Sequence, residues 1–196
     1  MIDTTGTHVY GEFTSTIAAS DEYLTLHFSP SNAPRKQRWR NYGLSADFLG
    51  DYFAAFFPGD TPTNGQINQR DTVKAAVSFI ANELLENAVK YSETVGDRPI
   101  TISLYLYKQK IVFQVVNFSD RSTTKSYQQF IEELSHSDPD MLYAQQLEKT
   151  ALGTGESCIG ILTMINDYGA SFSWQFQELD STPEVVQVAV MVSLDV

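Results

Sequence analysis

The chain has 196 residues and a net charge of −11, with 13 Lys and Arg against 24 Asp and Glu. This acidic balance argues against binding to nucleic acid or to anionic membranes, because both need an excess of Lys and Arg. The single cysteine, Cys158, excludes an intramolecular disulfide. A signal-peptide pattern and an apolar run of about 18 residues are both missing, so we expect a cytoplasmic protein that does not enter membranes.

The first third of the chain carries two strand patterns and one helix pattern. Residues 10–17 and 22–28 are rich in β-branched and aromatic residues around a turn-like pair, which predicts a hairpin. A helix is predicted over about residues 36–57, because its aromatic residues recur mainly on one side and read as core. Pro58 directly after this pattern ends it.

A cluster of basic residues stands where that helix is expected to begin. We interpret it first as a solvated helix start, and the alternative is a docking patch for an acidic partner. The cluster consists of Arg35, Lys36, Arg38 and Arg40.

The strongest helix pattern covers about residues 70–93, with an apolar stripe at three- and four-residue steps. Two alternating strands follow at 100–107 and 111–118, joined by a tight turn. Residues 119–152 carry no strand signal and are interpreted as a lid-like insertion with two helices, at about 126–134 and 139–152. The chain then carries a helix and two strands, at about 156–168, 171–179 and 184–194.

This order of elements predicts one domain over residues 1–196. Its expected fold class is α/β (α+β): a two-layer sandwich with a mixed, mostly antiparallel sheet and three main helices on one face.

The helix over 70–93 carries three polar residues that could support chemistry. Glu83, Asn87 and Lys90 are spaced i, i+4 and i+7, so their side chains are expected along one edge of the helix. The alternative interpretation is an ordinary solvated outer face.

A second polar feature precedes the helix over 156–168. Gly153, Thr154 and Gly155 stand where the helix would begin. Glycines expose consecutive backbone N–H groups, and a helix N-terminus carries partial positive charge, so the segment predicts a phosphate cradle. Such a segment can equally be a tight turn and nothing more.

Together these motifs resemble the Bergerat-type (GHKL) ATPases, in the branch of anti-sigma-factor serine kinases and histidine-kinase ATPase domains. The resemblance covers about residues 20–194 and rests on the segment Asn-Glu-Leu-Leu-Glu-Asn-Ala-Val-Lys-Tyr at 82–91. It implies that Glu83 is the general base and that Asn87 holds Mg²⁺. It also implies that Lys90 offsets phosphate charge and that the 153–155 segment contacts the phosphates of ATP.

The chain departs from the family pattern at the first glycine box. The family has Asp-x-Gly-x-Gly directly after a strand, and its Asp contacts the adenine amino group. Asn117 stands at that place here and no glycine follows it; Asp120 lies three positions further on, out of register. An Asn can still accept one hydrogen bond.

Two functions follow from the resemblance. The first is an ATP- and Mg²⁺-dependent regulator of a bacterial-type partner-switching system, acting as a Ser/Thr kinase on a small anti-sigma-antagonist-like protein. The second is a degenerate member that binds a protein partner without turning over nucleotide. An unrelated α/β domain is a third alternative, and the sequence leaves open whether the chain forms a homodimer.

Overall fold

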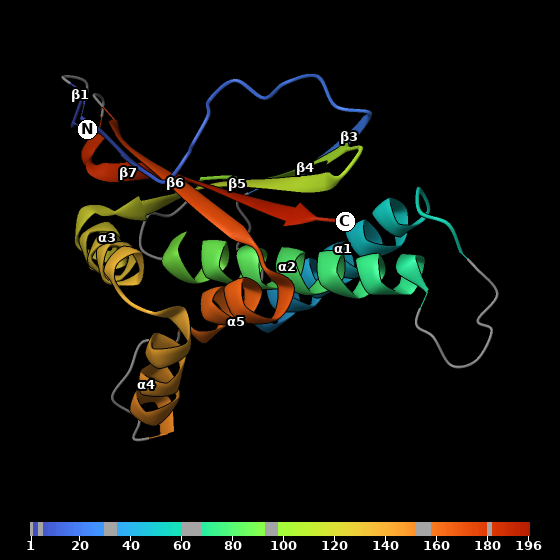
Figure 1. Cartoon of the computed structure of the whole chain (residues 1–196). Helices are drawn as coiled ribbons and strands as arrows, with labels where there is room; N and C mark the ends of the chain where they lie inside the picture. The colour runs from blue at the N-terminus through green and yellow to red at the C-terminus, as the bar shows by residue number, and fades with distance from the viewer. Residues whose placement is uncertain are drawn as a thin grey trace.

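The computed structural model describes residues 2–3, 6–29, 35–59, 68–92, 98–151, 158–179 and 182–196. They form two layers, with a seven-stranded sheet on one side and helices on the other (Figure 1). The strand order is β1-β2-β6-β7-β5-β4-β3, and each described neighbouring pair is antiparallel. The predicted two-layer fold is confirmed, with a sheet that is antiparallel in all of these pairs.

Alternation along the central strands separates the core face of the sheet from the outer face. In β5, every second residue from Ile111 to Ser119 is buried and faces the helices, because successive side chains of a strand point to opposite faces. The strands are β1 (Ile2–Asp3), β2 (Thr7–Tyr10), β3 (Glu22–Phe28), β4 (Ile100–Tyr107), β5 (Lys110–Asp120), β6 (Ser171–Leu179) and β7 (Thr182–Asp195).

The predicted hairpin near the N-terminus is wrong. β2 ends at Tyr10 and pairs with β6, whereas β3 pairs with β4 near the opposite edge of the sheet. Gly11 leaves the strand with a positive φ of 68°, and the connection to β3 crosses the sheet on the side away from the helices (Figure 1). An alternating pattern specifies that a segment is a strand, but it does not specify the neighbouring strand.

The helices are α1 (Arg35–Ala54), α2 (Gln69–Ser92), α3 (Arg121–His136), α4 (Pro139–Ala151) and α5 (Ile159–Tyr168). The long helix α2 lies along the core face of the sheet, with α1 and α5 beside it, and α4 projects away from both layers (Figure 1). The apolar stripe of α2 is buried as predicted, and its members include Val73, Val77, Ile80, Leu84 and Ala88. None of the described helices has the length and apolar character needed to cross a membrane.

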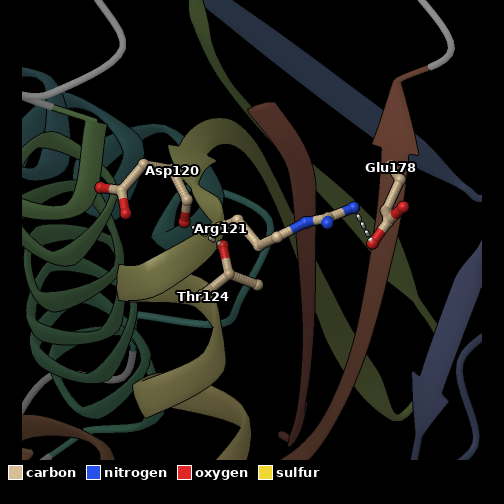
Figure 2. A network of polar contacts seen from close by, with 4 residues as sticks. All are labelled: Asp120, Arg121, Thr124 and Glu178. Carbon is tan, nitrogen blue, oxygen red and sulfur yellow. Dashed lines mark hydrogen bonds and ion pairs between the residues drawn. The ribbon is translucent and has the colours of Figure 1, made fainter. Parts of the chain in front are cut away.

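β5 passes into α3 without a loop. Asp120 is the N-cap: its carboxylate accepts from the Thr123 amide at 2.8 Å, and its carbonyl accepts from Thr124 Oγ1 at 2.8 Å. Arg121 forms an ion pair of 2.7 Å with Glu178 on β6 (Figure 2). The helix therefore starts about five residues before the predicted position and is tied to the sheet at its first turn.

Candidate functional site

One face of α2 is turned toward α5. Phe79, Glu83 and Asn87 follow each other at four-residue steps on this face. Phe79 stacks on Tyr168 of α5, with ring centroids 5.0 Å apart. Glu83 and Asn87 are both half-buried. The polar edge predicted on α2 thus lies between two helices, and at these two positions it is not a solvated outer face.

The Glu83 carboxylate lies directly against Gly160 in the first turn of α5. A methyl group on Gly160 would collide with Glu83 Oε2 and would stand 2.8 Å from the carboxylate carbon. Burial raises the pKa of Glu83, and the neighbouring Glu86 raises it further by charge repulsion. A carboxylate with a raised pKa accepts a proton more readily near neutral pH, as a general base requires.

Asn87 lines a small cavity between α2, the sheet and α5. Within the described part of the chain, its amide has no hydrogen-bond partner. The cavity has a volume of about 20 Å³, which is room for about one water molecule. Its walls are formed by Leu84, Asn87, Ala88, Tyr91, Val115, Asn117, Tyr127, Ile161, Val188 and Val190.

An aromatic cluster closes this cavity from the side of α3. Tyr127 stacks on Tyr91 of α2, with ring centroids 5.6 Å apart, and meets Phe176 edge-on at 6.0 Å. Trp174 on β6 donates a hydrogen bond from Nε1 to the Tyr127 hydroxyl at 2.9 Å. Desolvation raises the pKa of Tyr127 well above its usual value, so the hydroxyl stays protonated.

Asn117 lies on the core face of β5 and is buried. Its Nδ2 donates to Ser92 Oγ at 3.1 Å and to the Ala88 carbonyl at 3.4 Å. These bonds tie β5 to the last turn of α2. Asn117 therefore lines the cavity, but its amide is turned toward α2. Asp120, the out-of-register alternative, is held by the first turn of α3.

Lys90 does not join the cavity wall. Its side chain is exposed, and its ammonium lies 5.1 Å from the centroid of the Tyr91 ring. The predicted phosphate cradle, Gly153, Thr154 and Gly155, lies outside the described residues. Of the predicted site residues that the structure describes, Asn87 and Asn117 share the cavity and Glu83 lies one turn away on α2.

The described residues provide no ready-made metal centre. No group of three His, Cys, Asp or Glu side chains comes together among them. A Mg²⁺ ion at Asn87 would therefore depend on nucleotide oxygens and water for most of its ligands, which is common for this ion.

Three residues of the site were not singled out from the sequence. Tyr127 closes the cavity, Trp174 donates a hydrogen bond to the Tyr127 hydroxyl, and Gly160 makes room for the Glu83 carboxylate. The signal for Gly160 was present, since a glycine in a helical pattern often marks a close approach. Aromatic residues at helix or strand spacing are typical of an ordinary core, so the sequence carries no signal that distinguishes Tyr127 and Trp174.

No family model and no curated protein match the sequence. Among solved structures, a similar chain comes from "The crystal structure of SiaB-SiaC complex from Pseudomonas aeruginosa". The similarity has a TM-score of 0.58 at 15% sequence identity and covers 86% of this chain and 89% of that chain. At this identity the comparison establishes a shared fold over most of both chains.

Proposed function

We propose that this chain is a regulatory protein of a partner-switching signalling system, and that it acts on a small anti-sigma-antagonist-like protein. The observation that carries this proposal is the placement of Glu83 and Asn87 on the face of α2 that meets the first turn of α5. The resemblance of the α2 sequence to the Bergerat-type ATPases gives these two side chains their roles. The fold shared with a chain from a two-protein complex supports a protein as the partner.

The finer form of the proposal is a Ser/Thr kinase that uses ATP and Mg²⁺. Bound ATP would supply the phosphoryl group, and ADP would leave. Asn87 would offer its side-chain oxygen to Mg²⁺, which prefers hard oxygen ligands. Glu83 would accept the proton of the Ser or Thr hydroxyl of the partner, and its raised pKa suits that role. Lys90 and the 153–155 segment would offset and contact phosphate.

The described geometry fits the Mg²⁺-binding part of the proposed site better than its adenine-binding part. Nucleotide-sized ligands occupy pockets of roughly 300–1,000 Å³, whereas the cavity here is about 20 Å³. Tyr127 fills the space beside Tyr91, and the Asn117 amide is bonded to α2. Adenine could enter only if Tyr127 moved. This observation favours the second candidate, a degenerate member that regulates its partner by binding alone.

Calorimetric titration of the whole chain with ATP and ADP in the presence of Mg²⁺ separates the two candidates. If the chain is a kinase, Glu83→Ala should keep nucleotide affinity and lose phosphotransfer by about a hundred- to ten-thousandfold. Asn87→Ala should weaken Mg²⁺-nucleotide binding itself. Partner binding without nucleotide binding supports the degenerate regulator, and the absence of both would overturn the proposal.

We propose three further properties of this protein. Residues 1–196 act as one domain, residues 119–152 act as a lid over the site, and the protein works in the cytoplasm. The lid is the most accessible to measurement. Hydrogen exchange over 119–152 should slow when a nucleotide binds, relative to the exchange of α2.

A further inference from the structure

A cavity lies on the outer face of the sheet, beneath the connection from β2 to β3. We refer to this connection, residues 11–21, as the strap; it crosses the sheet on the side away from the helices (Figure 1). The strap forms the roof of the cavity, and β4, β5, β6 and β7 form its floor. The volume is about 700 Å³, which is within the range of small-ligand sites and far above the 20 Å³ of the cavity beside Asn87.

The strap is tied to the sheet on both sides of this cavity. Gly11 packs against β6, where a methyl group would come within 2.8 Å of the Phe172 carbonyl oxygen. On the other side, the Tyr107 hydroxyl donates a hydrogen bond to the Ala18 carbonyl at 3.0 Å. Residues 14–16 between these anchors are exposed although two of them line the cavity. The strap therefore arches over the floor instead of packing onto it.

The floor combines apolar side chains with hydroxyl groups. Val112 and Met191 are buried apolar residues on the outer face of β5 and β7. Ser171, Ser173 and Ser193 line the same floor, and each hydroxyl can both donate and accept a hydrogen bond. Such a floor suits a ligand that carries both amide groups and an apolar side chain.

Two opposite charges line the cavity on different strands. Glu12 follows Gly11 on the β6 side, whereas Lys110 is the first residue of β5 and lies 5.6 Å from the centroid of the Tyr107 ring. In the described part of the chain neither charge forms an ion pair, and Asp195, the cross-strand neighbour of Lys110, forms none with it. Only β7 separates β6 from β5, so two strand spacings set the charged positions about 10 Å apart.

We propose that this cavity binds a short peptide of about three residues whose two ends are free. The ammonium of the peptide lies against Glu12 and its carboxylate against Lys110, because the ends of an extended tripeptide are about 10 Å apart. Its central side chain packs on Val112 and Met191, and the serine hydroxyls bond its amide groups. This site lies on the opposite face of the sheet from Asn87, and it does not depend on nucleotide binding or on phosphotransfer.

Calorimetric titration of the whole chain with the tripeptide Ala-Leu-Ala at neutral pH tests the site. We expect a dissociation constant of about 0.1–1 mM, since a small ligand with few contacts binds weakly. Acetylation of the amino end removes the positive charge of the peptide, and amidation of the carboxyl end removes the negative charge. Because ion pairs at exposed side chains are weak, each change should lower the affinity about two- to fivefold.

Substitutions in the protein identify which side chain contacts which end of the peptide. Lys110→Gln should weaken binding of the free tripeptide about two- to fivefold and should have no further effect on the amidated peptide. Glu12→Gln should behave in the same way toward the acetylated peptide. The matched controls are Lys108→Gln and Glu184→Gln, because both side chains are exposed and lie outside the cavity lining. All four substitutions change exposed residues, so each variant should keep its fold.

Four outcomes would overturn the proposal. The first is a wild type that binds no tripeptide up to about 10 mM. The second is binding that neither acetylation nor amidation weakens, because the site would then not contact the charged ends. The third is an equal loss in the matched controls, which would mean a general charge effect. The fourth is sensitivity to one end alone, because the site would then hold the terminus of a longer chain.

Discussion

Trp174 donates a hydrogen bond from its indole nitrogen to the Tyr127 hydroxyl over 2.9 Å. This bond joins β6 to α3, and it holds the Tyr127 ring in place between Tyr91 and Phe176. The same ring closes the cavity beside Asn87. Tyr127 therefore both links α3 to the sheet and closes the site.

Removing only the Tyr127 hydroxyl should have a measurable cost. We expect Tyr127→Phe to lower the free energy of unfolding by about 1 kcal/mol, because the buried Trp174 N–H loses its acceptor. Urea unfolding measures the difference. Tyr23→Phe, at a side chain that is 63% exposed, should stay within about 0.5 kcal/mol of the wild type. Equal losses in the two variants would mean that the bond to Trp174 does not stabilise the fold.

Removing the whole Tyr127 ring should open the site. Because a nucleotide must displace this ring, we expect Tyr127→Ala to bind Mg²⁺-ATP about tenfold more tightly for each 1.4 kcal/mol of opening free energy removed. Fluorescence of Trp174 in a Trp39→Phe background reports the change, since these are the two tryptophans of the chain. Tyr23→Ala on the outer face of the sheet is the control. Unchanged affinity in Tyr127→Ala would show that the ring does not block the site.

The contact between Glu83 and Gly160 removes the usual gain of a helix substitution. In most helices Gly→Ala is stabilising by about 1 kcal/mol. At position 160 the new methyl group would force the end of the Glu83 side chain to move, so we expect Gly160→Ala to lose that gain and to change the free energy of unfolding by less than about 0.5 kcal/mol. In a Glu83→Ala background the same change should be stabilising. A double-mutant cycle measured by urea unfolding gives the coupling, and additive effects would show that the two residues do not touch.

The raised pKa of Glu83 makes a prediction about stability and pH. A carboxyl group with a folded-state pKa above its unfolded value binds its proton more tightly in the folded protein. The stability that it contributes is present below the unfolded pKa and is lost as pH rises through the folded pKa. We therefore expect Glu83→Gln to melt at a higher temperature than the wild type at pH 7–8 and at a similar temperature near pH 4. Parallel melting curves at all pH values would contradict the shift.

The sequence predicted the helices and strands better than it predicted which strands pair with each other. Strands β3 to β7 were recognised because each alternates locally, whereas the partner of β2 lies far away in β6 and no local pattern names it. The start of α3 was misplaced because Asp120 serves as both the last strand residue and the helix cap.

The sequence predicted only the part of the site that lies on one helix. Glu83 and Asn87 share a helix and a motif, so the sequence indicates both. In the structure Glu83 lies against Gly160 of α5, and Asn87 lines the cavity. Tyr127 joins them only through the packing of α3 on the sheet. Such packing depends on contacts between distant segments, and residue spacing does not report it.

The family resemblance and the structure give the Asn117 side chain different contacts. By family position it would face adenine, and replacing it with the family's Asp would be expected to raise ATP affinity. In the structure its Nδ2 is a donor to Ser92 and to the Ala88 carbonyl, inside the core. A carboxylate has no hydrogen to donate, so Asp at this position would meet the Ala88 carbonyl with two acceptors facing each other.

We therefore expect Asn117→Asp to lower the free energy of unfolding by about 1–3 kcal/mol at pH 7, the usual cost of an unsatisfied buried polar group. Burial should raise the pKa of the new carboxyl, so the loss should shrink as pH falls and the group takes up a proton that it can donate. Gln114→Glu on the outer face of β5 is the matched control and should change stability little at either pH. Urea unfolding at pH 7 and pH 4.5 checks both variants, and ATP titration of Asn117→Asp runs beside it. A fully stable Asn117→Asp protein that binds ATP more tightly than the wild type would return Asn117 to the adenine site; a destabilised one without tighter binding leaves it as the link between β5 and α2.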